Sequence, residues 1–155
     1  RLSRETPFNF TRHNALPLLV PDNSFAPFNA QATMWSRKAF PYMMLPTTVH
    51  GRVSDIWRSY IAQHMFHKSK IRTVFVAPDI VQIRNPHRTQ DDFVAEKPLY
   101  EQTEAVVTLL HTSNFSTTRD VYVALYDRGI LEQRDIELQT EWDSLVNAAM
   151  HVVHE

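Results

Sequence analysis

The chain has 155 residues, of which 43% are hydrophobic and 21% charged, the balance of a folded globular domain rather than a disordered segment. Its 16 basic and 17 acidic residues are mixed along the sequence and give a formal charge of −1, which argues against nucleic acid as a partner. Cysteine is absent, so disulfides, thiolate nucleophiles and cysteine-ligated zinc are excluded.

Apolar stretches such as Ala15–Val20 and Val74–Ala77 are far shorter than the roughly 20 residues that cross a bilayer. The chain starts at Arg1 without Met, so we expect an excerpt of a longer protein, with any membrane anchor outside it. Two sequons, Asn9-Phe10-Thr11 and Asn114-Phe115-Ser116, are compatible with a secretory lumen.

The first half of the sequence predicts short strands, prolines and one good helix. Ala32–Trp35 and Thr73–Ala77 are the better strand candidates, because they are short and rich in β-branched or aromatic residues. Ser36–Met44 predicts a brief helical or turn region, and the spacing of apolar residues predicts a helix from about Val53 to Phe66.

That helix shows the clearest pattern in the chain. At 100° per residue one side is apolar, and the other carries Asp55, Ser59 and Ala62, so we expect Asp55 and Arg58 to point at water or at a cleft. The apolar side comprises Val53, Ile56, Trp57, Tyr60, Ile61 and His64.

The second half predicts helices. One follows Pro98, a second covers Thr118–Arg128 with Ser116 or Thr117 as its cap and Gly129 at its end, and a third has Leu138, Trp142, Leu145, Ala149 and Val152 on one stripe. A soft boundary near Arg88 to Asp91 divides the chain into residues 1–88 and 89–155. With only two glycines, the sequence excludes a glycine-rich phosphate loop.

Asp55 is a candidate general base or orienting carboxylate for a substrate hydroxyl. The alternative is that Ser54 caps the helix while Asp55 complements its dipole. Arg52 and Arg58 are candidates for clamping a phosphate or pyrophosphate, with surface ion pairs as the alternative.

Two further candidate sites lie outside the helix. Asn29 and Gln31 share a face if the backbone is extended, and such amides can contact sugar hydroxyls; turn hydrogen bonding is the alternative. His87, in the segment Arg84-Asn-Pro-His-Arg88 that follows an apolar run, is the best metal-ligand candidate, with a plain surface histidine as the alternative. Asp91-Asp92 fits a metal-binding pair or a helix start.

Several short pieces of the sequence together match the pattern of a known family. They are Arg1-Leu-Ser-Arg4, Pro27-Phe-Asn-Ala-Gln-Ala-Thr33, Leu45-Pro46, Arg52-Val-Ser-Asp-Ile-Trp-Arg-Ser-Tyr-Ile-Ala-Gln63, Arg84-Asn85 with His87, and Asp92-Phe93 with Glu96-Lys97 and Leu99-Tyr100. With these pieces the chain resembles the STELLO-type glycosyltransferase family, and they occur in the family's order over roughly the first two thirds of the chain.

The resemblance implies a Golgi type II membrane protein whose lumenal part is similar to GT-A glycosyltransferases and to reversibly glycosylated polypeptides. It therefore predicts an α/β fold, namely the C-terminal portion of a GT-A-like (Rossmann-like) domain in residues 1–88, followed by a helical region packed on the same domain in residues 89–155. On that template a divalent metal, Mn²⁺, would be held by an Asp-x-Asp motif before Arg1, with His87 as a later ligand.

The resemblance also implies the function: transfer of a sugar from a nucleotide-sugar donor to a glycan acceptor. Asp55 would be catalytic, His87 would bind the metal, and the substrate contacts would come from Asn29, Gln31, Arg52, Trp57, Arg58, Arg84 and Asn85. The rival hypothesis is a catalytically inactive assembly factor that binds other Golgi enzymes, such as polysaccharide synthases, through Leu138, Trp142 and Leu145.

Overall fold

The computed structural model describes residues 16–77 and 88–151. Within these ranges 60% of the residues are helical and 3% lie in strands. The elements in chain order are β1 (Leu18–Leu19), a 3₁₀ helix η1 (Arg37–Tyr42), α1 (Gly51–Ser69), β2 (Val74–Phe75), α2 (Thr89–Ala95), α3 (Lys97–Thr112), α4 (Thr118–Tyr126) and α5 (Gln133–His151). None of the described helices is long and apolar enough to span a membrane.

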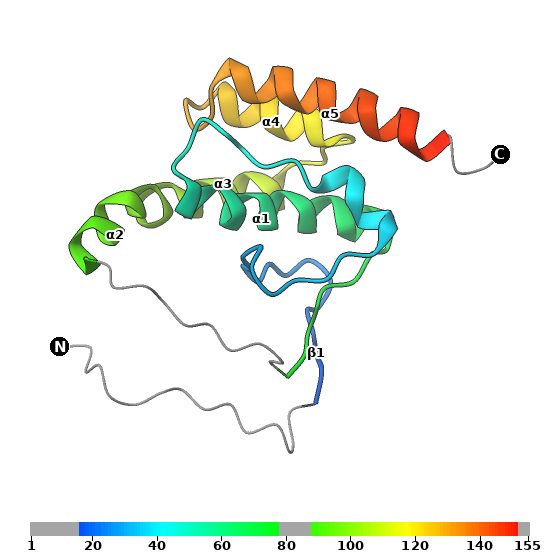
Figure 1. The fold of residues 1–155 in the computed structure, drawn as a ribbon, viewed down its shortest axis with the longest axis horizontal. Coiled ribbons are helices and arrows are strands. Elements are labelled where there is room, and N and C mark those ends of the chain that lie inside the picture. The colour runs from blue at the N-terminus through cyan, green and yellow to red at the C-terminus, as the bar shows by residue number, and fades with distance from the viewer. Residues whose placement is uncertain (1–15, 78–87, 152–155) are drawn as a thin grey trace.

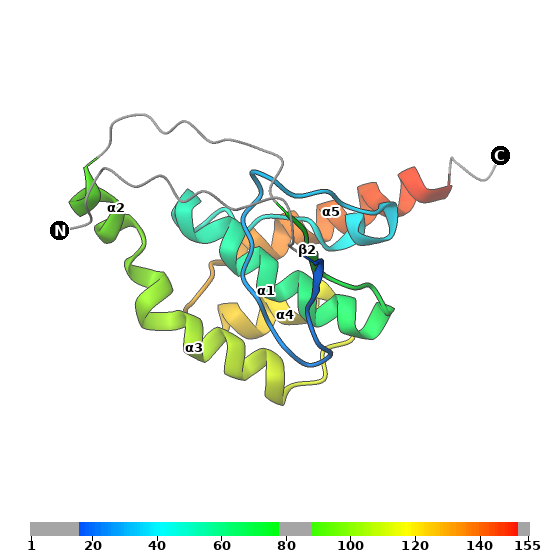
Figure 2. The same ribbon diagram turned by 90° about the horizontal axis from the view of Figure 1, so that it is seen from below.

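The helices are arranged around α1. Figure 1 shows α4 and α5 together on one side of the pair formed by α1 and α3, and the irregular segment that precedes η1 on the other side. Seen from below in Figure 2, that segment runs along α1, while α2 extends α3 away from the centre. Helix α1 is thus covered from several directions.

This position explains where the amphipathic prediction for α1 holds and where it fails. The predicted apolar side is confirmed, since Val53, Trp57 and Ile61 are buried in the main core. The opposite side is not a solvent-facing surface, because Ser59 and Ala62, which lie on it, are fully buried. A helix packed on both sides must bury its polar stripe as well, and such polar groups need internal hydrogen-bond partners.

The main core joins the two predicted regions of the chain. Val53, Trp57 and Ile61 of α1 pack in one cluster with residues of α3 and α4, including Val106 and Val121. A smaller cluster places Ala62 and Phe66 of α1 against Ala39 and Met43 of the η1 segment. Residues on both sides of the predicted boundary at 88/89 therefore share one hydrophobic core.

The predicted α/β fold is wrong for the described residues, which form a mostly helical domain rather than the C-terminal portion of a GT-A-like domain. Val74–Phe75 does form a strand, and among the described residues it pairs only with Leu18–Leu19, in an antiparallel ladder. Ala32–Trp35 contains no strand. Parallel sheets need strands buried on both faces, whereas all four ladder residues here are exposed.

Other local predictions are confirmed. Ser36–Met44 contains the 3₁₀ helix, and Pro98 lies in the first turn of α3, where its missing N–H costs no hydrogen bond. Thr117 caps α4 through a capping box with Asp120, and Gly129 follows α4 with φ of 67°. These features depend on a few neighbouring residues, which is why the sequence indicates them.

Asp135, in the first turn of α5, anchors the segment before α1. Its Oδ1 accepts hydrogen bonds from Thr47 N at 2.6 Å and Thr47 Oγ1 at 2.9 Å, and its Oδ2 accepts from Thr48 N at 3.4 Å and from Thr48 Oγ1. The carboxylate is fully buried. No sequence pattern indicated this contact, because it joins residues nearly 90 positions apart.

His64 is buried against the loop that follows α3, with its ring 5.7 Å from the ring of Phe115 and its Nε2 without a hydrogen-bond partner among the described residues. Burial lowers the pKa of His64 below its usual 6.5, and the nearby Lys68 lowers it further. The pKa of His67 is lowered in the same direction by burial and by His111. Both imidazoles are therefore neutral in the folded protein at pH 7.

We expect the contribution of these two imidazoles to the free energy of unfolding to be constant above about pH 7 and to fall as the pH drops below about 6.5. The unfolded chain binds protons on these imidazoles first, so the folded state loses stability in that window. Urea unfolding at pH 7.5, 6.5 and 5.5 measures the effect. His64→Phe should reduce the slope, and an unchanged slope would mean that other groups cause it.

Candidate functional site

The polar stripe of α1 holds the irregular segment that precedes η1. Gln63 accepts a hydrogen bond from Ala26 N at 3.0 Å and donates from Nε2 to Ala26 O at 2.8 Å. Four residues earlier, Ser59 Oγ accepts from Phe28 N at 3.3 Å. The buried side chains of α1 thus act as a template for the backbone of residues 26–28.

Asp55 continues this stripe at the more exposed end of α1. Its Oδ2 accepts a hydrogen bond from Ala30 N at 3.2 Å, whereas Oδ1 forms no hydrogen bond to any described residue. The carboxylate is half-exposed. One oxygen is therefore held by the fold and the other is available to a ligand.

The predicted amides Asn29 and Gln31 lie on either side of Ala30, next to Asp55. The extended backbone expected for them is not found: Asn29 Oδ1 accepts from Gln31 N at 3.2 Å, and Asn29 O accepts from Thr33 Oγ1 at 2.7 Å, which closes a turn. Both amide side chains are exposed. Their role as sugar contacts stays a prediction, but the fold does place them beside Asp55.

Arg58 is the least expected member of this region, because its side chain is only 4% exposed. Its guanidinium lies 4.9 Å from the ring centroid of Trp35, and Nη1 is 3.7 Å from Met43 Sδ. The Nε and Nη2 atoms have no hydrogen-bond partner among the described residues. Burial lowers the pKa of Arg58, while attraction to Asp55 acts in the opposite direction. Of the two surroundings expected for Arg58, water or a cleft, its burial contradicts the first.

Arg52 is held by acidic side chains of α2 and of the α2–α3 junction. Its guanidinium forms ion pairs with Asp92 at 2.5 Å and Glu96 at 2.8 Å, which tie the start of α1 to α2 and to the α2–α3 junction. The structure thus does not bring Arg52 and Arg58 together as a phosphate clamp. For Arg52 the alternative of ion pairs is the arrangement found.

Trp57 and Ser54 are parts of the interior. Trp57 is fully buried and donates from Nε1 to Thr103 Oγ1 at 3.2 Å, so it joins α1 to α3 rather than lining a surface. Ser54 is not the helix cap, because its Oγ donates to Pro46 O and the cap is His50, whose Nδ1 accepts from Arg52 N at 3.2 Å. The proposed dipole role of Asp55 beside a Ser54 cap is therefore not supported.

The remaining predicted residues, Arg84, Asn85 and His87, lie outside the described ranges. Among the residues that are described, no group of three or more His, Asp or Glu side chains could hold a metal ion. The predicted divalent metal stays a prediction, since its predicted ligand His87 lies outside the described residues.

Sequence reasoning missed Trp35, Phe28 and the template role of Ser59 and Gln63. The ring of Trp35, which lies over the buried guanidinium of Arg58, also contacts the ring of Phe28 in a tilted arrangement with the centroids 5.2 Å apart. The sequence indicated these contacts only indirectly. A row of polar residues that includes an arginine, on a helix that is otherwise apolar, needs hydrogen-bond partners from elsewhere in the chain if it is buried. Their identity depends on tertiary contacts.

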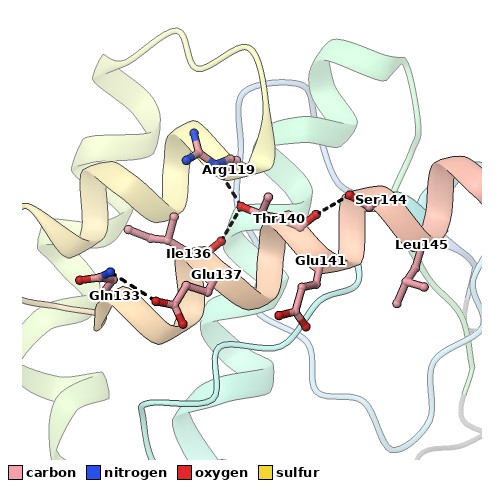
Figure 3. Close-up of a pocket in the computed structure, with 8 residues that line it drawn as sticks. All are labelled: Arg119, Gln133, Ile136, Glu137, Thr140, Glu141, Ser144 and Leu145. Atoms are coloured by element: carbon pink, nitrogen blue, oxygen red, sulfur yellow. Dashed lines mark hydrogen bonds between the residues drawn. The ribbon is translucent and has the colours of Figure 1, made fainter.

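A separate hollow of about 710 Å³ lies on the outer face of α4 and α5. Figure 3 shows its lining, where Ile136 and Leu145 supply apolar surface and Arg119 donates from Nε to Thr140 Oγ1 at 3.1 Å. It is shallow and open, and its lining is mainly apolar. This hollow contains none of the predicted site residues.

Taken together, the described residues define a mostly helical domain with a carboxylate at the surface of its central helix, beside an amide-bearing turn and above a buried guanidinium. A family model for STELLO glycosyltransferases matches residues 52–141, which run from the start of α1 into α5. Since the match covers more than half of the chain, the chain belongs to this family and the suspected resemblance is confirmed. No curated protein and no solved structure matches the chain.

The buried position of Arg58 leads to a prediction that separates stability from function. Replacing a buried charge by an apolar side chain of similar volume is often neutral or stabilising, so Arg58→Met should change the free energy of unfolding by less than about 1 kcal/mol or raise it. The same substitution should lower activity if the charge serves Asp55.

Urea unfolding with circular dichroism measures the first effect, and Arg58→Lys is the matched control because it keeps the charge but loses the planar contact with Trp35. Strong destabilisation by Arg58→Met, which keeps the side-chain volume, would show that the charge of Arg58 stabilises the fold through its contact with Trp35, and would contradict this prediction.

Proposed function

We propose that this chain contributes the acceptor-binding side of a nucleotide-sugar-dependent glycosyltransferase site, with Asp55 as the catalytic carboxylate. Membership of the STELLO glycosyltransferase family supports sugar transfer as the reaction class. The observation that carries the assignment of Asp55 is the asymmetry of its carboxylate, with Oδ2 held by Ala30 N and Oδ1 left for a ligand.

In the proposed reaction, an acceptor hydroxyl donates a hydrogen bond to Asp55 Oδ1. The hydroxyl oxygen forms a bond to C1 of the donor sugar as the bond between C1 and the diphosphate oxygen breaks, and the proton passes to Asp55. The nucleoside diphosphate leaves with the electron pair of the broken bond. Asn29 and Gln31 are exposed beside Asp55 and are suited to contact sugar hydroxyls.

The buried charge of Arg58 supports this role for Asp55. The guanidinium is buried next to Asp55, and the attraction between the two charges helps to fix the position of the carboxylate. Arg58 is thus a positioning residue in this proposal, and we do not assign it a contact with the diphosphate.

Location and cofactor are part of the proposal. We place the chain on the lumenal side of the Golgi membrane, with membrane attachment through a segment outside this chain and with a nucleotide sugar and a glycan as substrates. A divalent metal, Mn²⁺, remains a prediction with His87 as its ligand, and no step above passes through it.

A catalytically inactive assembly factor is the second candidate, and one observation favours it. Leu145 is 67% exposed at the edge of the hollow on α4 and α5, where another Golgi enzyme could dock. The two other predicted anchors are engaged internally: Leu138 packs against the core, and Trp142 donates from Nε1 to Pro41 O at 3.1 Å. Two of the three residues predicted to dock a partner thus make contacts within the domain, and this supports the glycosyltransferase proposal over the assembly factor.

Calorimetric titration of the full-length protein with a panel of nucleotide sugars, with and without Mn²⁺, tests the proposed function. We expect binding of one donor class that depends on Mn²⁺ and weakens in His87→Ala. Absence of binding by a folded sample, shown by circular dichroism, would overturn the enzyme proposal in favour of the assembly factor.

A further inference from the structure

The loop between α3 and α4 presents the sequon Asn114-Phe115-Ser116 at the protein surface. Asn114 and Ser116 are exposed, whereas the ring of Phe115 is half-buried and packs against the main core. The two residues that a glycosylation sequon needs in solvent are accessible, while the residue between them anchors the loop.

Lys68 of α1 fixes the orientation of the asparagine. Its Nζ donates to Asn114 Oδ1 at 2.6 Å and also to Phe115 O. The Nδ2 atom of Asn114 forms no hydrogen bond to any described residue. An N-linked sugar replaces one hydrogen of Nδ2 and leaves Oδ1 as an acceptor, so the hydrogen bond from Lys68 persists in the modified protein.

The hydroxyl group of Ser116, which the sequon also requires, forms no hydrogen bond to any described residue. Asp120 accepts hydrogen bonds from Ser116 N at 3.2 Å and Thr117 N at 2.9 Å, and Thr117 Oγ1 accepts from Asp120 N at 3.1 Å, which together cap α4. These bonds use the backbone of Ser116 and leave its Oγ free of described partners. The loop is thus ordered without using either group that the modification requires.

We propose that Asn114 is a site of N-linked glycosylation, a proposal that rests on the lumenal placement in the proposed function. The donor would be a lipid-linked oligosaccharide: the bond between its C1 and the phosphate oxygen breaks, C1 bonds to Asn114 Nδ2, and the lipid diphosphate leaves. The displaced Nδ2 proton passes to the transferase that catalyses the step. The glycan then projects from the α3–α4 loop. This loop contacts α1 at Lys68, near the C-terminal end of the helix, whereas the turn beside Asp55 lies near its N-terminal end.

Two experimental arms separate this proposal from the proposed function. In the first arm, the full chain is directed into the secretory pathway of cultured cells by an added signal peptide, and its mobility is compared before and after treatment with an N-glycan-cleaving amidase. We expect Asn114→Gln and Ser116→Ala each to remove one mobility step, and Ser116→Thr, which keeps the sequon, to retain it.

Asn9→Gln in the same arm identifies any step that belongs to the other sequon. If Asn114→Gln leaves the mobility unchanged, Asn114 is not modified and the inference is overturned. A wild-type chain that shows no amidase-sensitive step in the lumen overturns it as well.

In the second arm, the native protein is examined in its own membranes by the amidase and by protease protection. A protected, amidase-sensitive protein supports the lumenal placement and this inference. A protease-accessible, unmodified native protein together with a modified secreted chain would overturn the lumenal placement, and with it the natural modification, although Asn114 is chemically competent. A protected but unmodified native protein would overturn this inference alone.

Discussion

Replacing Asp55 with Asn is expected to lower turnover by a factor of at least about 100 while leaving the fold intact, as expected when a general base is lost. The side-chain oxygen of Asn can still accept the hydrogen bond that Ala30 N donates to Asp55 Oδ2, so the segment above α1 stays in place. What the substitution removes is the negative charge and the ability to accept a proton.

Release of nucleoside diphosphate from the donor identified by calorimetry measures this effect. Glu104→Gln is the matched control, because it neutralises an exposed carboxylate on α3 that lies outside the candidate site. Asp55→Ala should lose activity and also loosen the turn, because Ala30 N then loses its acceptor. Unchanged turnover in Asp55→Asn would remove Asp55 from the mechanism. Its role would then be structural, as the hydrogen-bond acceptor that holds the backbone of Ala30.

Asp135→Ala is expected to cost about 3–5 kcal/mol of folding free energy, a large share of the stability of a domain of this size. The substitution removes one buried acceptor and leaves the N–H and O–H donors of Thr47 and Thr48 without their partner. The loss would release the segment before α1 from the first turn of α5.

Urea unfolding measures this effect as a lower midpoint with an unchanged slope. Glu137→Ala, in the same turn of α5 but exposed, is the control and should change the stability by less than about 0.5 kcal/mol. A small effect of Asp135→Ala would mean that water replaces the carboxylate at little cost, and the contact would then be a consequence of packing by other residues.

Local features of the chain could be predicted because a few neighbouring residues determine them. The capping box of Thr117 and Asp120, the position of Pro98 and the apolar side of α1 follow from backbone chemistry and from helical spacing. The candidate carboxylate Asp55 was also identified in this way, as a polar residue on a strongly apolar helix.

The fold class could not be predicted from the same signals. The runs around Leu18 and Val74 have strand composition, but a strand becomes part of a larger sheet only when further strands pair with it. Within the described part of the chain these two runs pair only with each other. The resemblance to α/β enzymes then supplied a fold that the described residues do not form.

The sequence by itself determined the family, the helices of the second half and the candidate carboxylate. Only the tertiary structure decided what surrounds them: that Arg58 is buried beneath Trp35, that Asp55 shares its carboxylate with Ala30, and that Asp135 holds Thr47. The physical reason is range. Helix caps and amphipathic faces arise from residues within a few positions of one another, whereas burial and hydrogen-bond partners depend on which distant segments the folded core brings together.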